Sequence, residues 1–323
     1  MLEIPTKRTL KIFTGRSNPE LAEEIARHLK QPLGGVELET FANGEIYCRY
    51  GESVRGADVF VVQTHSDPIN EMIMEQAIMI DALKRASAKR ITAVCPYYGY
   101  SRQDKKARSR EPITARLVAD LLSSAGADRV ISVDLHTGQI QGFFSTPFDH
   151  LTAMPVLADW VRREIKSEVV VVAPDAGRVK TTERFASTLQ SDVALVYKRR
   201  SVEARNETES LAVVGDVEGR NCLIVDDMID TAGTICGAAM QLRDAGAEDV
   251  IALATHGIFS GAAVDRLKNS VISRVVITNS VPVSEDRRFD KLTVLSCAPI
   301  FAAAIRAVFE DTTVSGIFGG DNV

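Results

Sequence analysis

The sequence has no long apolar run, and this absence argues against a membrane-spanning protein. Its 323 residues are 45% apolar and 25% charged, an ordinary composition for a globular chain long enough for two domains. No apolar stretch approaches the roughly 20 residues that a helix needs to cross a bilayer. Residues Met1 to Lys11 carry no apolar signal core. We therefore expect a cytoplasmic protein that does not insert into membranes.

Positive charge is not in excess either. The chain has 38 Lys and Arg residues against 43 Asp and Glu residues, for a formal net charge of -5. Proteins that bind nucleic acid or anionic lipid without sequence specificity usually carry a basic surface. We therefore expect no nucleic-acid partner and no membrane partner.

Cysteine is scarce and irregularly placed. The five cysteines show no paired spacing; they are Cys48, Cys95, Cys222, Cys236 and Cys297. This pattern favours reduced, mostly buried thiols in a cytosolic protein over disulfides or a zinc site.

Apolar runs alternate with helical patterns along almost the whole chain. Strands are expected at 58–63, 90–95, 129–133, 168–173, 193–197, 221–225, 249–254 and 274–278. Helices are expected at 18–29, 68–86, 112–125, 179–189 and 234–245. This alternation predicts an α/β fold of mainly parallel sheets flanked by helices.

Two of the expected strands end alike, which indicates a weak internal duplication. Segments 130–136 and 223–227 both place acidic or imidazole groups just past an apolar run. We interpret the chain as two related domains, residues 1–150 and 151–297. No low-complexity linker separates them, and the helical stretch within 298–318 is expected to return to the first domain.

Segment 221–234 is the most informative part of the chain. An apolar run, expected to be a buried strand, is followed by Asp226 and Asp227. Open α/β sheets bind ligands at the carboxyl ends of their strands, and carboxylates there accept hydrogen bonds from the hydroxyls of a sugar. Residues 230–234 then offer backbone N–H groups, two hydroxyls and a helix amino terminus, which suit a phosphate. The segment predicts a sugar-phosphate pocket.

A simpler interpretation is that an Asp at a strand end caps the following helix. Three neighbouring carboxylates (Asp226, Asp227 and Asp230) repel one another unless a ligand or a metal ion lies among them. The cluster therefore favours a binding site.

Segment 96–112 holds five cations in nine residues; they are Arg102, Lys105, Lys106, Arg108 and Arg110. A solvated surface loop is the simpler interpretation. However, the segment follows a strand, has Gly99 as a hinge, and belongs to an otherwise acidic protein. Because Arg binds phosphate oxygens in a bidentate manner, a basic lid over a polyphosphate is favoured, with Gln103 reading a base or ribose edge.

Three smaller signals remain open. Segment 41–45, which contains Asn-Gly, is either a plain hairpin turn or an adenine contact made by Phe41 and its neighbours. His136 and Asp175 are either structural or metal ligands, and Mg²⁺ prefers carboxylate over imidazole. Lys198 and Arg200 form either an exposed basic turn or the cations that a transferring phosphoryl group requires.

Together these segments resemble the ribose-phosphate diphosphokinases, also called phosphoribosyl diphosphate synthetases. The resemblance covers nearly the whole chain. It is carried by segments 41–45, 82–88, 101–112, 133–136, 139–144, 174–177, 198–200 and 225–234. The Arg-Gln-Asp loop at 102–104 and the Gln-Ile-Gln-Gly-Phe-Phe run at 139–144 are more specific than the sugar-phosphate signature, which defines only the phosphoribosyltransferase-like superfamily.

The resemblance implies a role for each matching position. ATP would be bound by Phe41, Asn43, Glu45, Arg102, Gln103 and Asp104. Ribose 5-phosphate would be bound by Arg200, Asp226, Asp227, Asp230, Thr231, Ala232, Gly233 and Thr234. Lys198 and Arg200 would be catalytic, and His136 and Asp175 would engage Mg²⁺, the implied cofactor.

The implied reaction transfers the β,γ-diphosphoryl group of ATP to the 1-hydroxyl of ribose 5-phosphate, giving 5-phosphoribosyl 1-diphosphate and AMP. The family also implies a homo-hexamer with phosphate and ADP as effectors. This chain departs from the family pattern at Arg178, where a glycine is usual, at Asn43, where Asp is commoner, and in the tail at 314–318.

Two alternatives stay open on the sequence. A phosphoribosyltransferase would share segment 225–234 but would not need the Arg-Gln-Asp loop. A non-catalytic regulatory subunit should show damage at catalytic positions, whereas Lys198, Arg200, His136 and Arg102 are all present.

Overall fold

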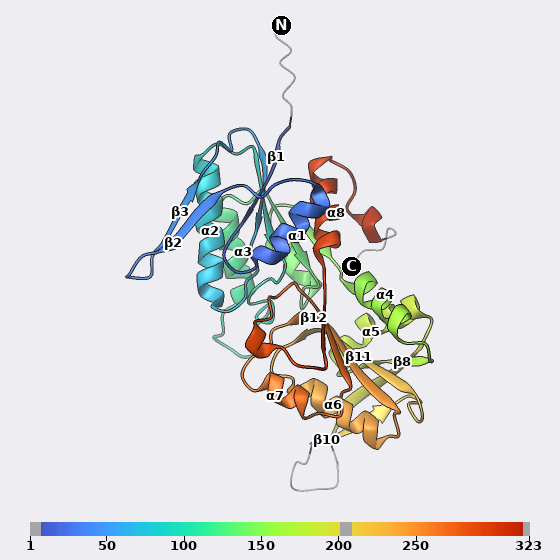
Figure 1. The fold of residues 1–323 in the computed structure, drawn as a ribbon. Helices are drawn as coiled ribbons and strands as arrows, with labels where there is room; N and C mark the ends of the chain where they lie inside the picture. The colour runs from blue at the N-terminus through green and yellow to red at the C-terminus, as the bar shows by residue number, and fades with distance from the viewer. Residues whose placement is uncertain (1–7, 201–208, 319–323) are drawn as a thin grey trace. The chain divides into compact units, whose positions relative to one another are not determined.

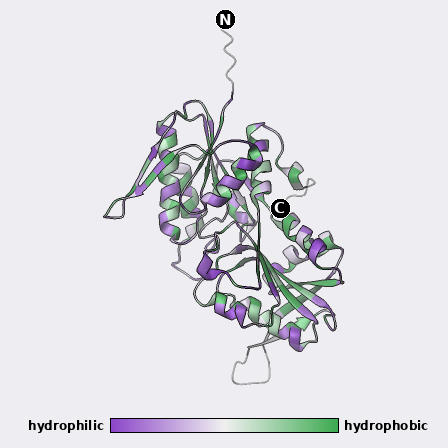
Figure 2. Cartoon of the chain, viewed as in Figure 1, coloured by the Kyte–Doolittle hydropathy of each residue, from purple (hydrophilic) through white to green (hydrophobic). Residues whose placement is uncertain are grey.

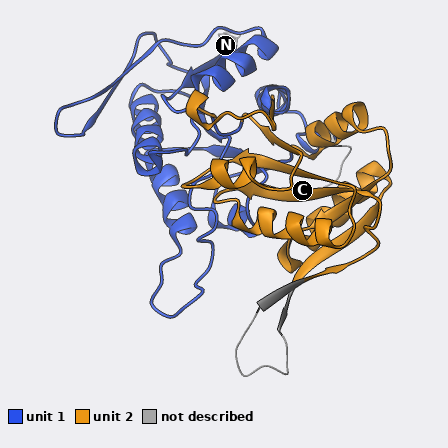
Figure 3. Ribbon diagram, turned by 60° about the horizontal axis from the view of Figure 1, so that its bottom comes forward, with its two compact units in different colours: residues 1–152, 280–282, 297–323 blue, residues 153–279, 283–296 orange. Residues whose placement is uncertain are grey.

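The computed structural model describes residues 8–200 and 209–318, with the backbone alone for 198–200, 209–211 and 318. The chain divides into two compact units (Figure 3). Unit 1 comprises Met1–Thr152, Ser280–Pro282 and Cys297–Val323, and unit 2 comprises Ala153–Asn279 and Val283–Ser296.

Unit 1 is built on a five-stranded sheet in which every strand is parallel to its neighbour (Figure 1). The strands, in sheet order, are β1 (Leu10–Thr14), β4 (Asp58–Val62), β5 (Arg90–Cys95), β6 (Arg129–Val133) and β7 (Phe148–Leu151). The helices are α1 (Pro19–Leu29), α2 (Ile69–Arg85), α3 (Thr114–Ala125) and α8 (Ala298–Phe309). A separate antiparallel hairpin joins β2 (Val36–Thr40) to β3 (Ile46–Tyr50).

The sheet of unit 1 is covered on both faces, because all five residues of β4 are buried. A continuous run of apolar residues is what a strand needs when helices lie on both sides of it. Side chains of α2 and α3 pack with Val59 and Val61 in one core cluster. Helix α1 begins where the Asn18 side chain caps the Leu21 N–H and Pro19 occupies the first turn.

The carboxyl-terminal segment belongs to unit 1. Helix α8 packs against α1, and the Arg306 guanidinium donates to the backbone oxygen of His28 at 3.3 Å. Farther along, Asp311 accepts from Arg90 at 2.8 Å, and Arg90 also pairs with the buried Asp58 at 2.6 Å. This charge cluster joins the end of the chain to strands β4 and β5.

Unit 2 contains a seven-stranded sheet. The strands, in sheet order, are β10 (Glu209–Val214), β9 (Asp192–Arg200), β8 (Val169–Ala173), β11 (Asn221–Ile229), β12 (Asp249–Gly257), β13 (Arg274–Thr278) and β14 (Leu292–Leu295). Strand β10 is antiparallel to β9, and the other neighbours are parallel. The helices are α4 (Met154–Glu164), α5 (Val179–Leu189), α6 (Gly233–Asp244) and α7 (Ala263–Lys268).

Side chains of the central strands of unit 2 point alternately to the two faces of the sheet and pack into two hydrophobic cores. Val170 and Val172 of β8 pack with side chains of α6 and α7, whereas Val171 packs with Trp160 of α4 and Phe185 of α5. Successive side chains of a strand point to opposite faces, so one strand serves both layers. Figure 2 shows the apolar colour concentrated on these strands and a mixed pattern on the helices. The predicted α/β class with mainly parallel sheets is confirmed.

Short 3₁₀ helices complete the structure: η1 (Gly138–Phe143), η2 (Ala176–Arg178), η3 (Glu285–Arg287) and η4 (Ser315–Phe318). Among the described residues, no helix is long and apolar enough to cross a bilayer.

One strand is longer than the sequence predicted, and the difference affects the candidate site. Strand β11 runs to Ile229, so Asp226 and Asp227 lie within it and not beyond its end. Pairing with β8 stops at Ile224 opposite Val172, while pairing with β12 continues to Ile229. The two carboxylates therefore follow the point at which one neighbouring strand has ended.

Candidate functional site

The two carboxylates on β11 are held by one guanidinium group. Arg178 Nε lies 2.8 Å from Asp226 Oδ1, and Arg178 Nη2 lies 2.7 Å from Asp227 Oδ1. The three side chains retain only 13%, 14% and 6% of their exposure, respectively. Arg178 ends η2, directly before α5, so the contact joins the loop after β8 to the strand beside it.

Burial and repulsion shift the acidity of this pair. Burial raises the pKa of Asp226 well above its usual range, and the neighbouring Asp227 raises the pKa further, while Arg178 lowers it. Removal of a carboxylate from water and a like charge beside it both disfavour the ionised form. The guanidinium therefore favours two negative charges at this position. The Asp227 N–H, which donates to Asp226 Oδ1 at 2.8 Å, also favours the ionised form of Asp226.

The turn between β11 and α6 is the segment that the sequence predicted to bind a phosphate. Ala232, just before α6, is in the left-handed region with φ +61°. The Asp230 oxygen accepts from the Ser260 N–H at 2.9 Å, and the Thr231 oxygen accepts from Arg266 Nη1 at 2.7 Å. The side chains of Thr231 and Thr234 remain exposed. The two carbonyls are thus engaged within the protein, and both threonine residues remain accessible to a ligand.

A pocket of about 870 Å³ joins this turn to the loop after β8. It is lined by Pro174, Asp175, Ala176, Gly177, Val196, Tyr197, Gly233, Thr234, Gly237 and Ala238. Asp175 Oδ1 accepts from the Gly177 N–H at 2.8 Å, which fixes the loop. The structure therefore brings Asp175 and Thr234, predicted separately, to the same pocket.

The basic loop of unit 1, residues 99–111, lies between β5 and α3. Its five cations are exposed, but hydrogen bonds to other parts of unit 1 hold its first half in place. Asp104 is buried, and its Oδ2 accepts from Thr137 Oγ1 at 2.7 Å and from Gln139. Gln103 Oε1 accepts from Thr114 Oγ1 at 2.6 Å. Of the three residues predicted to bind ATP here, Asp104 is engaged in holding the loop.

The predicted adenine segment is the turn of the β2–β3 hairpin. The Phe41 N–H donates to the Glu45 oxygen at 2.8 Å, and Asn43 Oδ1 accepts from the Glu45 N–H at 3.1 Å. Gly44 has φ +91°, a conformation that favours glycine. The Phe41 side chain is 50% exposed, and its ring centroid lies 6.0 Å from that of Tyr47. The turn leaves an aromatic surface accessible.

The remaining predicted residues are not brought into one cluster by any contact described. His136 follows β6 in unit 1 and Asp175 follows β8 in unit 2. Within residues 8–200 and 209–318, no group of three or more His, Cys, Asp or Glu side chains is placed to hold a metal ion. Lys198 and Arg200 end β9, and their side chains lie outside the described part of the structure.

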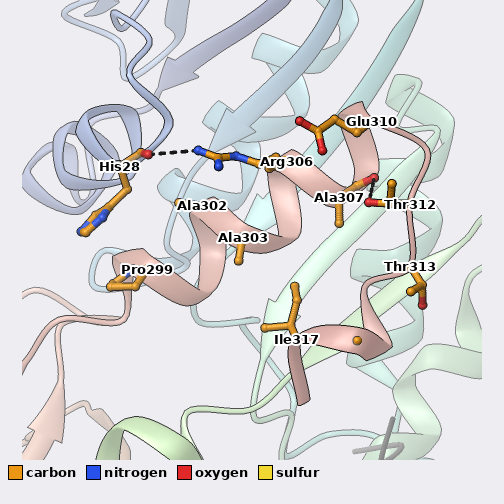
Figure 4. Close-up of a pocket in the computed structure, with 11 residues that line it drawn as sticks. His28, Pro299, Ala302, Ala303, Arg306, Ala307, Glu310, Thr312, Thr313 and Ile317 are labelled. Atoms are coloured by element: carbon orange, nitrogen blue, oxygen red, sulfur yellow. Dashed lines mark hydrogen bonds between the residues drawn. The ribbon is translucent and has the colours of Figure 1, made fainter. Parts of the chain in front are cut away.

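A second pocket, of about 420 Å³, lies in unit 1 along α8 and η4 (Figure 4). Arg306 and Glu310 line it, together with His28 from the end of α1. None of the residues predicted to bind ATP or the sugar phosphate lines this pocket.

Two contacts at the site were missed by the sequence analysis. Arg266 of α7 donates to the Thr231 oxygen in the turn before α6. The two residues are far apart in the sequence, so no local pattern indicates the contact. Arg178 was noted only as a departure from the family pattern, whereas it pairs with the two carboxylates expected to bind ribose.

Two mainly parallel sheets, one of them with an acidic pair and a phosphate-type turn on a central strand, define a phosphoribosyltransferase-like α/β protein. Family models match residues 10–126, as the N-terminal domain of ribose phosphate pyrophosphokinase, and residues 201–319, as a phosphoribosyl synthetase-associated domain.

Curated relatives are similar in sequence to nearly the whole chain. Ribose-phosphate pyrophosphokinase of Streptomyces coelicolor is 56% identical over 313 residues, which cover 97% of each chain, and that of Bifidobacterium longum is 56% identical over 322 residues, which cover 98% of this chain and 95% of the relative. The crystal structure of phosphoribosylpyrophosphate synthetase from Mycobacterium smegmatis matches with a TM-score of 0.89 and 52% identity, and covers 94% of this chain and all of that one. The chain belongs to the ribose-phosphate pyrophosphokinase family and is an enzyme of that type.

Proposed function

We propose that this enzyme transfers the β,γ-diphosphoryl group of ATP to the 1-hydroxyl of ribose 5-phosphate, giving 5-phosphoribosyl 1-diphosphate and AMP for nucleotide biosynthesis. The observation that carries the proposal is the single pocket that joins the loop at 174–177 to the phosphate turn at 233–234. One pocket thus offers a turn suited to the 5-phosphate beside a second loop suited to the group attached at the sugar's 1-position.

Unit 2 supplies the sugar-phosphate site in this proposal. Thr231, Thr234 and the backbone N–H groups at the start of α6 bind the 5-phosphate, because an exposed helix amino terminus attracts an anion. Asp226 and Asp227 accept hydrogen bonds from the ribose hydroxyls. Burial of these carboxylates makes those hydrogen bonds stronger than they would be in water.

Unit 1 supplies the nucleotide site. Arg102 and Gln103 of the basic loop bind ATP. Phe41, Asn43 and Glu45 of the hairpin turn contact the adenine, and in a hexamer this turn belongs to a neighbouring subunit. The protein performs little covalent chemistry in phosphoryl transfer. Catalysis therefore depends on aligning the two substrates and on stabilising the negative charge of the phosphate groups. Lys198 and Arg200 stabilise the charge that develops on the transferring group.

The residues present fit Mg²⁺ as cofactor. The carboxylate of Asp175 is a hard oxygen ligand in the pocket, and Mg²⁺ is usually held by one or two carboxylates together with phosphate oxygens of the substrate. Asp175 and His136 would engage the ion and the nucleotide that carries it. When bound, Mg²⁺ neutralises phosphate charge.

Assembly, regulation and location are part of the same proposal. We propose a homo-hexamer with phosphate and ADP as effectors, in keeping with the family resemblance, and a cytoplasmic location. All five cysteines are free thiols, as expected in a reducing compartment.

The direct test incubates the purified protein with Mg²⁺, ATP and ribose 5-phosphate and quantifies AMP and 5-phosphoribosyl 1-diphosphate. Equal amounts of the two products are expected. A phosphoribosyltransferase would instead consume added 5-phosphoribosyl 1-diphosphate in the presence of a nucleobase and form no AMP from ATP. A non-catalytic regulatory subunit would form neither product unless a catalytic partner were added.

A further inference from the structure

The basic loop begins at a buried polar cluster that none of the assigned roles explains. His65 follows β4, is fully buried, and lies between Gln76 of α2 and Gly99, the first residue of the basic loop. His65 Nε2 lies 2.8 Å from Gln76 Oε1, and His65 Nδ1 lies 3.0 Å from the Gly99 nitrogen.

These contacts determine which ring nitrogen carries the proton. The Gly99 N–H donates to Nδ1, so Nδ1 must be unprotonated and Nε2 must carry the hydrogen. Nε2 then donates to Gln76 Oε1. Burial lowers the pKa of His65 to about 4, which keeps the ring neutral and preserves the acceptor.

Gln76 is itself held in one orientation. Its Nε2 donates to the backbone oxygens of Val61 at 3.2 Å and Val94 at 3.4 Å, and its Oε1 also accepts from the Cys95 thiol at 3.3 Å. The amide thus bridges β4 and β5. His65 contacts both Gln76 and Gly99, and so it links these two strands to the loop that follows β5.

The position of Gly99 leaves no room for a larger side chain. A Cβ at this position would lie 2.9 Å from the His65 Cβ and 3.1 Å from Ile69 Cδ1. Tyr100, the next residue, has φ +61°, and its backbone oxygen accepts from the Gln103 N–H at 2.8 Å. The path from Gly99 to Gln103 is therefore determined at its origin by the histidine and at its far end by the Gln103 and Asp104 contacts.

We infer that His65 is a positioning residue for nucleotide binding: its Nδ1 anchors Gly99 and so holds Arg102 and Gln103 where they bind ATP. The inference rests on the proposed function, because only there is the loop assigned to ATP. It does not make His65 a catalytic residue, since the ring is fully buried.

Two substitutions separate this role from simple packing. In His65→Asn the amide oxygen occupies a place close to Nδ1 and can still accept from the Gly99 N–H. In His65→Gln the side-chain amide reaches toward Gln76, in the place of Nε2, and leaves the Gly99 N–H without its acceptor. Both variants lose the buried ring, so similar decreases in melting temperature are expected.

The measurement is steady-state kinetics with each substrate varied in turn. For His65→Gln we expect kcat/KM for ATP to fall by about 10- to 100-fold, as for a misplaced binding group, with KM for ribose 5-phosphate within about twofold. His65→Asn should keep kcat/KM for ATP within about threefold of the wild type. Equal losses in the two variants would overturn the inference.

Limited trypsin digestion gives a readout that does not depend on activity. Mass analysis of early fragments reports cleavage after Arg102, Lys105, Lys106 and Arg108, and faster cleavage at these sites is expected in His65→Gln than in His65→Asn. Equal cleavage rates would also contradict the inference. If the wild type makes no AMP, the proposed function fails, and the digestion still decides whether His65 anchors the loop.

Discussion

Arg178 and Asp226 form a mostly buried ion pair, with 2.8 Å between Nε and Oδ1, and the same guanidinium reaches Asp227 at 2.7 Å. Because two adjacent buried carboxylates repel each other, the cation determines how readily both are ionised.

Substitution Arg178→Gln is expected to raise the pKa of Asp226 still further, because a cation that favours its ionised form is lost. Activity that needs the ionised carboxylate should then require a higher pH. We expect the acidic limb of kcat/KM for ribose 5-phosphate to move up by about one to three pH units. Arg162→Gln is the matched control, since Arg162 pairs with an exposed Asp159 in the same unit. An unmoved limb would contradict this view of Arg178.

Substitution Lys198→Ala is expected to lower kcat by about 10²- to 10³-fold or more, the usual cost of removing a group that stabilises charge in a transition state. Circular dichroism and the melting temperature should stay close to those of the wild type. Lys166→Ala, which removes an exposed lysine of unit 2, should leave turnover unchanged. Near-normal turnover of Lys198→Ala would refute the assignment.

Substitution Phe41→Ala is expected to weaken ATP binding selectively. Stacking of a base on an aromatic side chain is worth about 1–3 kcal/mol, so KM for ATP should rise by about 5- to 150-fold while KM for ribose 5-phosphate is unaffected. The side chain is half exposed, so stability should change by no more than about 0.5 kcal/mol. A parallel rise in both KM values would show that the hairpin turn acts on the whole enzyme and not on the nucleotide.

Substitution Asp58→Ala is expected to destabilise unit 1. The Asp58 side chain is only 4% exposed and pairs with both Arg8 and Arg90. Loss of the acceptor for two partly buried cations should cost about 1–3 kcal/mol, seen as a lower urea midpoint. Asp81→Ala removes an exposed partner of Arg85 and should cost no more than about 0.5 kcal/mol. Equal midpoints for the two variants would show that the cluster does not hold the chain end.

Much of the fold followed from local pattern. Strands β5, β6 and β13 and helix α5 occupy the residues expected for them, because each is a strongly apolar or amphipathic segment with clear ends. The short strands β7 and β14 were not expected. Each has four residues at a sheet edge, and so brief a run carries too little periodicity to be recognised.

The candidate site was predicted in parts. The acidic pair and the phosphate turn were recognisable because their residues are neighbours in sequence. The end of β11 was misplaced by four residues, since β12 extends the strand past Asp226, and pairing with another strand leaves no local signature. Arg266 was missed for the same reason.

The sequence by itself determined the class of fold, the family and the chemical character of each loop, because spacing, charge and turn residues are local properties. Only the tertiary structure decided that Arg178 meets Asp226 and Asp227, that Asp175 shares a pocket with Thr234, and that His65 meets Gly99. These contacts arise where separate parallel strands end side by side, and their order in the sheet is not encoded in any one segment of the chain.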